Sequence, residues 1–348
     1  MNIAILGKFS VEELGSHISD TLTRMGHNVY EVEYGPKLNQ DKNNQQNYLM
    51  KLKIHSFNFG TNLNQKTRNY VLKHIMKQLL SINNLDLVIS TYDWLTFYEV
   101  DILKRNTKSK ISLWFPDAIV NFGRAYLMTA GYDYIFLKDP YVVRNMKDYY
   151  GFNNVYFMPE AFNPEIHKPV QLNKADEEKF QCDISMVGNL HSFRIPILEK
   201  LFSENKYNIK LYGGRAPYYI PVSSNLASKY TNQFVGNEVK SKAMQYSKIA
   251  LNTLHIGEIE SANARVFEIA GIGAFQLTAY RKGLEELFVI GKEIETYSSY
   301  DELVVKIDFY LKNEDKRKEI ARNGRLRAIK DHTYEVRLKK IIGIVTEV

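Results

Sequence analysis

Short apolar segments alternate with helix-like segments along the first part of the chain, and this alternation constrains the fold more than any other feature. The apolar segments predict strands at 2–6, 28–32, 86–90, 110–115, 134–137 and 155–158. Apolar residues with helical spacing lie between them, for example at 12–25 and 67–80. Because the strands are apolar at consecutive positions, both faces of their sheet must be covered. The pattern predicts an α/β fold with helices on both sides of a parallel sheet.

A proline-rich segment at 158–170 separates this pattern from a second one. Pro159, Pro164 and Pro169 resist both helix interiors and central strands, so we predict an interdomain linker here. The alternation then restarts, with strands predicted at 183–187, 208–212, 248–254 and 274–278. We therefore predict two Rossmann-like, doubly wound domains that face a cleft. The predicted boundaries are 1–165 for the first domain and 166–330 for the second, followed by a C-terminal helix at 331–348.

Two local features near the N-terminus carry further predictions. Ser10 and Glu13 stand three residues apart at the start of the first helical segment, which is the spacing of a capping box. Residues 35–65 are rich in Asn, Gln and Lys, and we expect a long loop or irregular insertion there.

Composition narrows the class of protein. Cys182 is the only cysteine, so an intrachain disulfide and a cysteine zinc cluster are excluded. The chain has no apolar run long enough for a membrane helix and no basic region before its short N-terminal apolar run, so we expect a cytoplasmic protein. The net charge of +7 attracts phosphates, or else simply keeps the protein soluble. Because the positive charges are spread along the chain, we expect a phosphate-bearing small molecule or an anionic membrane surface, and no nucleic acid.

The segment ESANARVFEIAGIGAFQLT, residues 260–278, carries the strongest functional signal. Asn263 is a good N-cap and Gly271 a good residue to follow a helix, so a helix is predicted at about 264–270. Glu268 lies inside this helix and Glu260 in the loop before it, so both carboxylates can face one cleft. The alternative is that both are surface charges on a short amphipathic helix.

This arrangement suits a sugar nucleotide. One carboxylate can accept hydrogen bonds from both hydroxyls of a ribose, and a second can bind hydroxyls of the sugar. A helix N-terminus supplies N–H donors to a diphosphate, and Arg265 in the first turn could add a bidentate contact. An arginine at this end opposes the helix dipole, and a bound phosphate would compensate for it.

The sequence NARVFEIAGIGAFQLT, followed by GLEELFVIGKEIETYSSYDEL, resembles the second domain of glycosyltransferases of the spore-maturation (CgeB-like) group. It is also similar to the wider retaining group with an E-x7-E signature. The resemblance implies the two-domain fold called GT-B and a nucleotide diphosphate sugar, UDP-type, as co-substrate without a separate cofactor. It implies that Glu268 binds the ribose hydroxyls, that Glu260 lies near the donor sugar, and that the turn at Gly271 and Gly273 lies beside the nucleotide.

The resemblance also implies that the last helix, from about 333 to 348, crosses back onto the first domain. It carries an apolar stripe of Leu338, Ile341, Ile342 and Val345. The alternative is a helix packed on its own domain.

Other candidate residues follow predicted strands. Gly188, Asn189 and Arg194 follow the first strand of the second domain, where a diphosphate loop is expected, and Gly213 ends the next strand near the expected base pocket. In the first domain, Asp117 and His17 are candidate general bases for an inverting reaction. In a retaining reaction, which the E-x7-E pattern favours, the donor phosphate can take the acceptor proton. No metal site is expected, because no HExxH motif or close ligand cluster is present.

The sequence thus predicts a metal-independent glycosyltransferase that moves a sugar from a nucleotide diphosphate donor to an acceptor hydroxyl. The acceptor is expected to be a glycan, a lipid-linked molecule or a protein, with peripheral contact at the inner face of a membrane as a further expectation. The alternatives are a sugar-nucleotide epimerase of the same fold and a non-catalytic sugar-nucleotide-binding protein.

Overall fold

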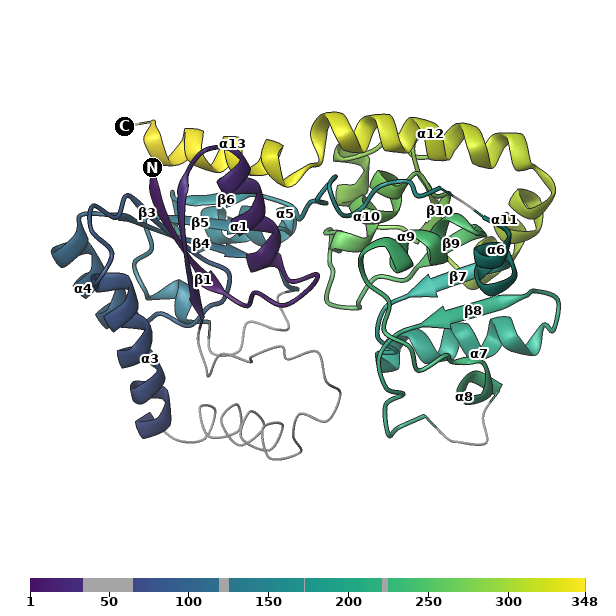
Figure 1. Cartoon of the computed structure of the whole chain (residues 1–348), viewed down its shortest axis with the longest axis horizontal. Helices are drawn as coiled ribbons and strands as arrows, with labels where there is room; N and C mark the ends of the chain where they lie inside the picture. The colour runs from purple at the N-terminus through teal and green to yellow at the C-terminus, as the bar shows by residue number, and fades with distance from the viewer. Residues whose placement is uncertain (34–64, 119–124, 172, 221–224, 348) are drawn as a thin grey trace.

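The computed structural model describes residues 1–33, 65–118, 125–171, 173–220 and 225–347. The chain forms two α/β halves side by side, with the last two helices running along one side of both (Figure 1). The loop expected at 35–65 falls almost wholly outside the described residues.

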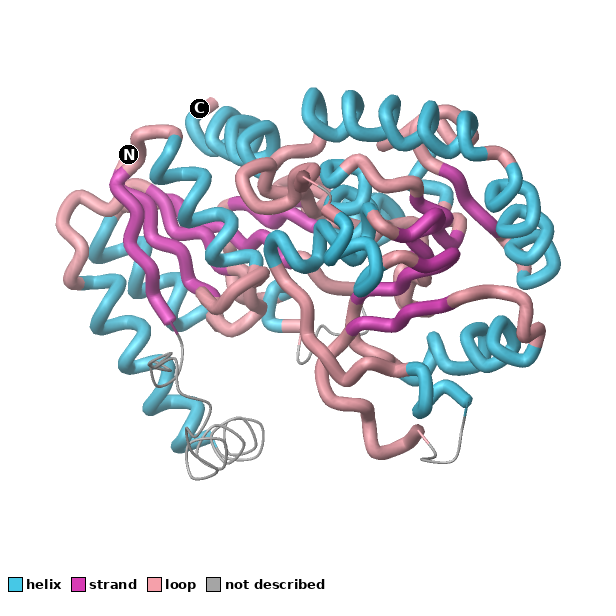
Figure 2. Tube along the Cα trace, turned by 45° about the vertical axis from the view of Figure 1, so that its right-hand side comes forward, coloured by secondary structure: helices cyan, strands magenta, loops and turns pink. Residues whose placement is uncertain are grey.

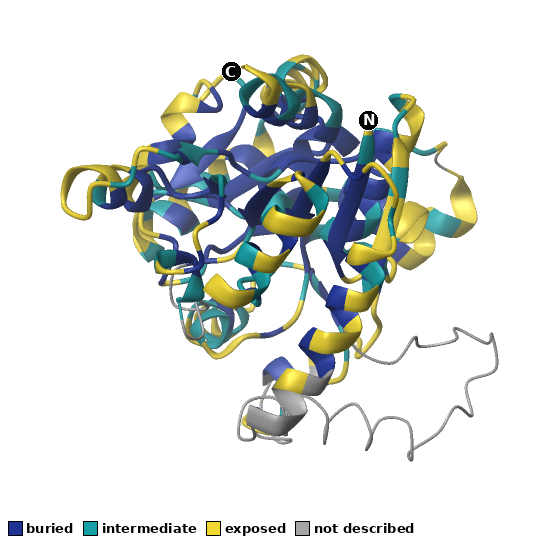
Figure 3. Ribbon diagram, turned by 90° about the vertical axis from the view of Figure 1, so that its left-hand side faces the viewer, coloured by how far each residue is buried: buried dark blue, intermediate teal, exposed yellow. Residues whose placement is uncertain are grey.

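The first half contains the parallel sheet that the apolar segments predict, and its strand order is β2-β1-β3-β4-β5-β6. β3 is buried at each of its positions, because helices cover both faces of the sheet (Figures 2 and 3). The strands are β1 (Asn2–Gly7), β2 (Asn28–Glu33), β3 (Leu87–Ser90), β4 (Lys110–Phe115), β5 (Tyr134–Leu137) and β6 (Val155–Phe157). The helices are α1 (Leu14–Arg24), α3 (Gln65–Leu80), α4 (Phe97–Thr107), η2 (Tyr126–Met128) and α5 (Pro140–Asp148).

The second half contains a parallel sheet with the strand order β11-β10-β9-β7-β8. β11, at the sheet edge, is a strand that the sequence analysis missed, because three residues are too few to show a period. The strands are β7 (Cys182–Val187), β8 (Ile209–Tyr212), β9 (Ser247–Asn252), β10 (Gln276–Ala279) and β11 (Glu295–Tyr297). The helices are α6 (Lys174–Phe180), η3 (Ser192–Arg194), α7 (Ile195–Ser203), α8 (Asn225–Lys229), α9 (Asn237–Gln245), α10 (Ala264–Ile272), η4 (Lys282–Glu286), α11 (Tyr300–Lys312) and α12 (Glu314–Asp331).

The start of α1 differs from the prediction. The helix begins at Leu14, and Glu13 is its N-cap without a side-chain capping bond, so the predicted capping box is wrong. The reason is the backbone of Glu12, which adopts a left-handed conformation with φ of 68° and separates Ser10 from the helix. A non-glycine residue in this region is strained, so other contacts must hold Glu12 there.

The predicted helix at 264–270 continues as α10 to Ile272 and ends at Gly273, whose φ of 80° is the left-handed cap that glycine favours. Gly271 therefore lies inside the helix and does not follow it. A Cβ atom at Gly271 would stand 2.3 Å from the ring of Phe162, a residue of the proline-rich linker. Glycine at 271 thus lets the linker pack directly against α10.

The C-terminal helix α13 (Tyr334–Thr346) crosses back to the first domain, as predicted. Leu338, Ile341 and Val345 join a buried apolar cluster with Ile18 and Leu22 of α1. None of the helices among the described residues combines the length and the apolar character that crossing a bilayer requires.

We expect Leu338→Ala to lower the free energy of unfolding by about 2–5 kcal/mol, because it leaves a cavity between α13 and the first domain. Leu338 is completely buried, whereas Leu326 of α12 is 63% exposed. Leu326→Ala is therefore the matched control and should change stability by less than about 0.5 kcal/mol. Urea denaturation measures both, and equal losses would contradict this packing of α13.

Candidate active site

A cleft of about 530 Å³ lies between the two domains. Its lining residues follow β1, β3, β4, β5 and β6 of the first domain and β7 and β9 of the second. These positions are the carboxyl ends of parallel strands, where α/β sheets bind ligands. The strand order reverses beside β1 in the first sheet and beside β7 in the second, so both switch points open into this cleft.

Two arginines converge on one side of the cleft, over Gly188. A Cβ atom at Gly188 would lie 2.9 Å from Nη1 of Arg194 and 3.7 Å from Nη2 of Arg265. Nη1 of Arg194 donates to the carbonyl of Asn189 at 2.7 Å, and its buried Nε has no partner among the described residues. Burial, together with the charge of Arg265, lowers the pKa of Arg194 to about 10, so it remains charged at neutral pH. A bound anion would offset this repulsion and accept the unused hydrogen bond.

The N-terminus of α10 points to the same side of the cleft. Asn263, Ala264 and Arg265 line the cleft there. Asn263 is the N-cap, but its side chain exchanges hydrogen bonds with Asn252 and does not cap the helix. The N–H groups of the first turn therefore lack a side-chain cap and add to the positive potential of the two arginines.

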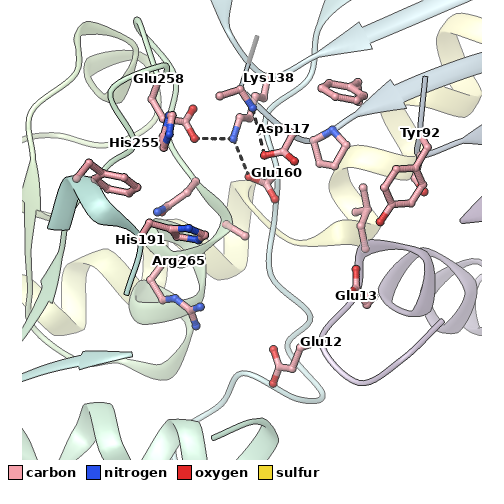
Figure 4. Close-up of a pocket in the computed structure, with 18 of the residues that line it drawn as sticks. Glu12, Glu13, Tyr92, Asp117, Lys138, Glu160, His191, His255, Glu258 and Arg265 are labelled. Carbon is pink, nitrogen blue, oxygen red and sulfur yellow. Dashed lines mark hydrogen bonds and ion pairs between the residues drawn. The ribbon is translucent and has the colours of Figure 1, made fainter. Parts of the chain in front are cut away.

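Three carboxylates and one lysine line another part of the cleft (Figure 4). Nζ of Lys138 lies 2.8 Å from the carboxylate of Glu258 and 3.4 Å from that of Glu160, and Asp117 lies nearby. Burial raises the pKa of Glu160 to about 7; Glu258 and Asp117 add to this rise, and Lys138 opposes it. Glu160 can therefore gain or lose a proton near neutral pH.

Sequence reasoning found Asp117 but missed Glu160, Glu258 and Lys138. These residues carry no motif, because Lys138 and Glu258 are 120 positions apart in the chain and meet only through the fold. The available signal was their place directly after predicted strands, which is weak for any single residue.

Glu268 lies behind Arg265 in a buried ion-pair cluster and does not itself line the cleft. Its carboxylate accepts from Nη1 of Arg265 at 2.8 Å and lies 3.1 Å from Nζ of Lys240 and 3.7 Å from Nε2 of His167. Burial alone would raise the pKa of Glu268, but Arg265, Lys240 and His167 outweigh it and hold this pKa well below its ordinary value.

Glu12 joins this cluster from the first domain. Its Oε1 accepts from the backbone N–H of Asn237 at 2.7 Å, and its Oε2 binds Nζ of Lys240 and, at 2.9 Å, Nε2 of His167. Burial opposes the charge of Glu12, but the hydrogen bond from His167 and the charge of Lys240 outweigh it and lower its pKa to about 2. These contacts hold the strained backbone of Glu12 in place.

Glu12, His17 and His167 lie close enough together to hold a metal ion. In this arrangement, however, the ammonium of Lys240 already neutralises the carboxylate of Glu12. Nδ1 of His167 accepts from the N–H of Asn163, so Nε2 carries the proton and donates to Glu12. The three side chains therefore serve the ion-pair cluster and do not present a free set of metal ligands.

His17 does not line the cleft, contrary to its prediction as a base there. It is buried, stacks on Tyr334 with ring centroids 5.2 Å apart, and meets the edge of His167 at 5.4 Å. Burial lowers the pKa of His17 to about 4, so the ring is neutral at pH 7.

Glu260 also points elsewhere than predicted. Both of its carboxylate oxygens accept from Nη2 of Arg144 at 2.8 Å, and Glu260 is not among the lining residues. The expectation that Glu260 and Glu268 face one cleft is therefore not what the structure shows. The loop carboxylate that does line the cleft is Glu258, two residues earlier.

The predicted glycines have packing reasons of their own. A Cβ atom at Gly213 would lie 2.1 Å from the hydroxyl of Tyr230 and 2.6 Å from the carbonyl of Gly188, so the chain there is too crowded for any side chain. Gly273 lies against Arg325 at the C-terminal end of α10, whereas the cleft is at the N-terminal end. Glycine is favoured there because the backbone has a positive φ of 80°.

Residues 194–343, which contain α10 and both cleft arginines, match a family described as glycosyl transferase-like. This part of the chain is similar to glycosyltransferase domains. No curated protein matches the chain in sequence. The narrower likeness to the spore-maturation group stays a prediction.

Solved structures show the same fold over the whole chain. Sucrose-phosphate synthase from Thermosynechococcus elongatus is similar at 13% identity with a TM-score of 0.71, over 99% of this chain and 98% of that one. HepE of Anabaena, solved in complex with UDP-glucose, is similar at 12% identity and a TM-score of 0.65, over 100% of both chains. A glycosyltransferase from Rickettsia africae ESF-5 is similar at 15% identity and a TM-score of 0.62, over 99% and 98%. The two-domain GT-B fold is thereby confirmed.

We expect His17 to make the folded protein sensitive to acid. The pKa of His17 is about 4 when folded and 6.5 ordinarily, so between these pH values the unfolded chain binds a proton that the folded protein does not. The free energy of unfolding should fall by up to about 3 kcal/mol from this group as the pH drops from 6.5 to 4.

The variant His17→Phe keeps a ring against Tyr334 and removes this titration. It should lose less stability than the wild type between pH 6.5 and pH 4.5 in urea denaturation. Other titrating groups, such as Glu160 and His332, are common to both proteins and largely cancel in the comparison. Parallel pH dependences would show that His17 is not buried in its neutral form.

Proposed function

We propose that the protein transfers a sugar from a UDP-type nucleotide diphosphate donor to an acceptor hydroxyl, with retention of configuration and without a metal ion. The observation that carries this proposal is the convergence of Arg194 and Arg265 over Gly188 at the N-terminus of α10. These groups lie in or beside the part of the chain that matches the glycosyl transferase-like family. The complex of HepE with UDP-glucose, in the same fold, supports the choice of a UDP donor.

The positive groups fit the chemistry of the leaving nucleotide. When the bond between sugar and phosphate breaks, negative charge grows on the diphosphate. Two guanidinium groups and the N–H groups of α10, fixed in advance and partly shielded from water, stabilise that charge without reorganising. The Nε of Arg194, which has no partner in the described part of the chain, supplies a donor for the diphosphate.

Glu268 remains our candidate for the ribose hydroxyls. Its carboxylate lies directly behind Arg265, and its interactions with Arg265 and Lys240 keep it ionised and able to accept further hydrogen bonds. We place the diphosphate beside the backbone of Gly188 and Asn189, which lies against Arg194. The nucleotide base is then expected beside Gly213, which packs against the carbonyl of Gly188.

The acceptor is proposed to be a hydroxyl of a glycan, of a lipid-linked molecule or of a protein. The carboxylates of Asp117 and Glu160 line the part of the cleft that the first domain supplies, and carboxylates accept hydrogen bonds from sugar hydroxyls. If the reaction instead inverts configuration, Asp117 is the candidate general base, because of the two predicted general bases only Asp117 lines the cleft.

The family match favours transfer over the alternatives of an epimerase and a non-catalytic binding protein. Incubation with a panel of UDP-sugars separates the three. We expect slow release of UDP in the absence of acceptor, faster release when the right acceptor hydroxyl is added, and no isomer of the sugar. Formation of an isomer, or binding of UDP-sugars without any turnover, would contradict transfer.

Two variants should show which part of the nucleotide Arg194 and Glu268 each contact. Arg194→Ala should weaken binding of UDP by about tenfold or more while changing that of uridine little, because only UDP carries the diphosphate. Glu268→Gln should weaken both ligands, because both carry the ribose. Isothermal titration calorimetry with UDP and uridine measures all four values.

Arg322→Ala, at an exposed position of α12 in the same domain and outside the cleft lining, serves as the control for the loss of one positive charge. Equal effects of Arg194→Ala on UDP and uridine would place Arg194 away from the diphosphate. A loss confined to UDP in Glu268→Gln would show that Glu268 orients Arg265 and does not touch the ribose.

A further inference from the structure

The loop at 255–262, between β9 and α10, is held by a carboxylate of the other domain. Oδ2 of Asp139 accepts from three consecutive backbone N–H groups, those of Ile259 at 3.1 Å, Glu260 at 3.1 Å and Ser261 at 3.3 Å. Its Oδ1 accepts from the N–H of Tyr141 at 3.0 Å and caps α5. Asp139 is only 5% exposed, so these charge-assisted bonds are shielded from water.

Two cations beside Asp139 hold the carboxylates of the same loop. Lys138 binds Glu258 at 2.8 Å, and Arg144 on α5 binds both oxygens of Glu260 at 2.8 Å. Glu258 also accepts from the hydroxyl of Ser261. We call Lys138, Asp139 and Arg144 the clasp. It comes from one segment of the first domain, and it fixes both the backbone and the acidic side chains of the loop.

The loop leads directly into the proposed diphosphate site. Ser261 is two residues before Asn263, and Asn263 to Arg265 line the cleft at the N-terminus of α10. A shift of the loop therefore moves the N–H groups and the guanidinium that would bind the donor. Asp139 and Arg144 do not line the cleft and so act only through the loop.

We propose that Asp139 and Arg144 are positioning residues that hold the β9–α10 loop in place. The donor site of the second domain is then complete only when the first domain is closed against it. This inference rests on the proposed function. It also assigns Glu260 a role different from the contact with the donor sugar implied by the E-x7-E resemblance, because both oxygens of Glu260 are bound by Arg144.

The first test is Asp139→Asn. The asparagine carbonyl oxygen can still cap α5, but the amide NH₂ then faces three N–H donors and cannot accept from them. We expect the KM for the UDP-sugar to rise about tenfold or more, on the scale of hydrogen bonds to a charged acceptor, with a smaller change in kcat. Asp148→Asn, on an exposed residue at the end of the same helix, should change neither value.

Hydrogen exchange of the peptide covering 255–262 gives a second readout that needs no donor. Exchange should speed up in Asp139→Asn and stay unchanged in Asp148→Asn. Unchanged exchange together with an unchanged KM in Asp139→Asn would overturn the inference. Failure of the wild type to bind any UDP-sugar would instead count against the proposed function, and the exchange result would still decide whether the clasp holds the loop.

A charge swap tests the pair of Arg144 and Glu260. The single variants Arg144→Glu and Glu260→Arg should each raise the KM for the donor, and the double variant should restore most of the loss. If Glu260 instead binds the donor sugar, the double variant stays as impaired as Glu260→Arg alone. That outcome would return Glu260 to the donor site and exclude its place in the clasp.

Discussion

Two parallel sheets can share one site only if their carboxyl ends face each other. The apolar contact of α13 with the first domain holds the two domains in this orientation. The chain leaves the first domain through a proline-rich linker and returns to it as α13, whose Leu338 and Ile341 are fully buried beside α1. The two domains are thus connected at two places, by the linker and by the packing of α13 on the first domain. The loops after β1, β4, β7 and β9 can then line one cleft.

Charge divides this cleft into two chemically distinct parts. Arg194 and Arg265 repel each other over Gly188, and Nε of Arg194 has no partner among the residues that the structure describes. On the other side, Asp117, Glu160 and Glu258 all interact with the ammonium of Lys138. Neither group is at its electrostatic optimum without a ligand. Such local conflict is expected at functional sites, where a substrate supplies the missing partner.

The sequence allowed most of the framework to be predicted, because strand and helix signals are local. Nearly every strand, and the positions of Arg194 and Arg265 after predicted strands, were readable from spacing within short windows. The return of the last helix to the first domain was expected from the family resemblance. The contacts of Glu12, Glu260 and Glu268 were not, because their partners Lys240, Arg144 and His167 lie far away in the chain. The left-handed backbone of Glu12 was equally hidden, since long-range ion pairs hold it against local preference.

The close packing of Phe162 on Gly271 has a consequence for how proteins of this kind diverge. The ring of the linker residue fills the space that a side chain on α10 would need. A larger residue at 271 therefore fits only if Phe162 is replaced by a residue with a smaller side chain. Substitutions at these two positions must be compensatory, and their covariation in an alignment would record the contact between the linker and α10, the helix that carries Arg265 in its first turn.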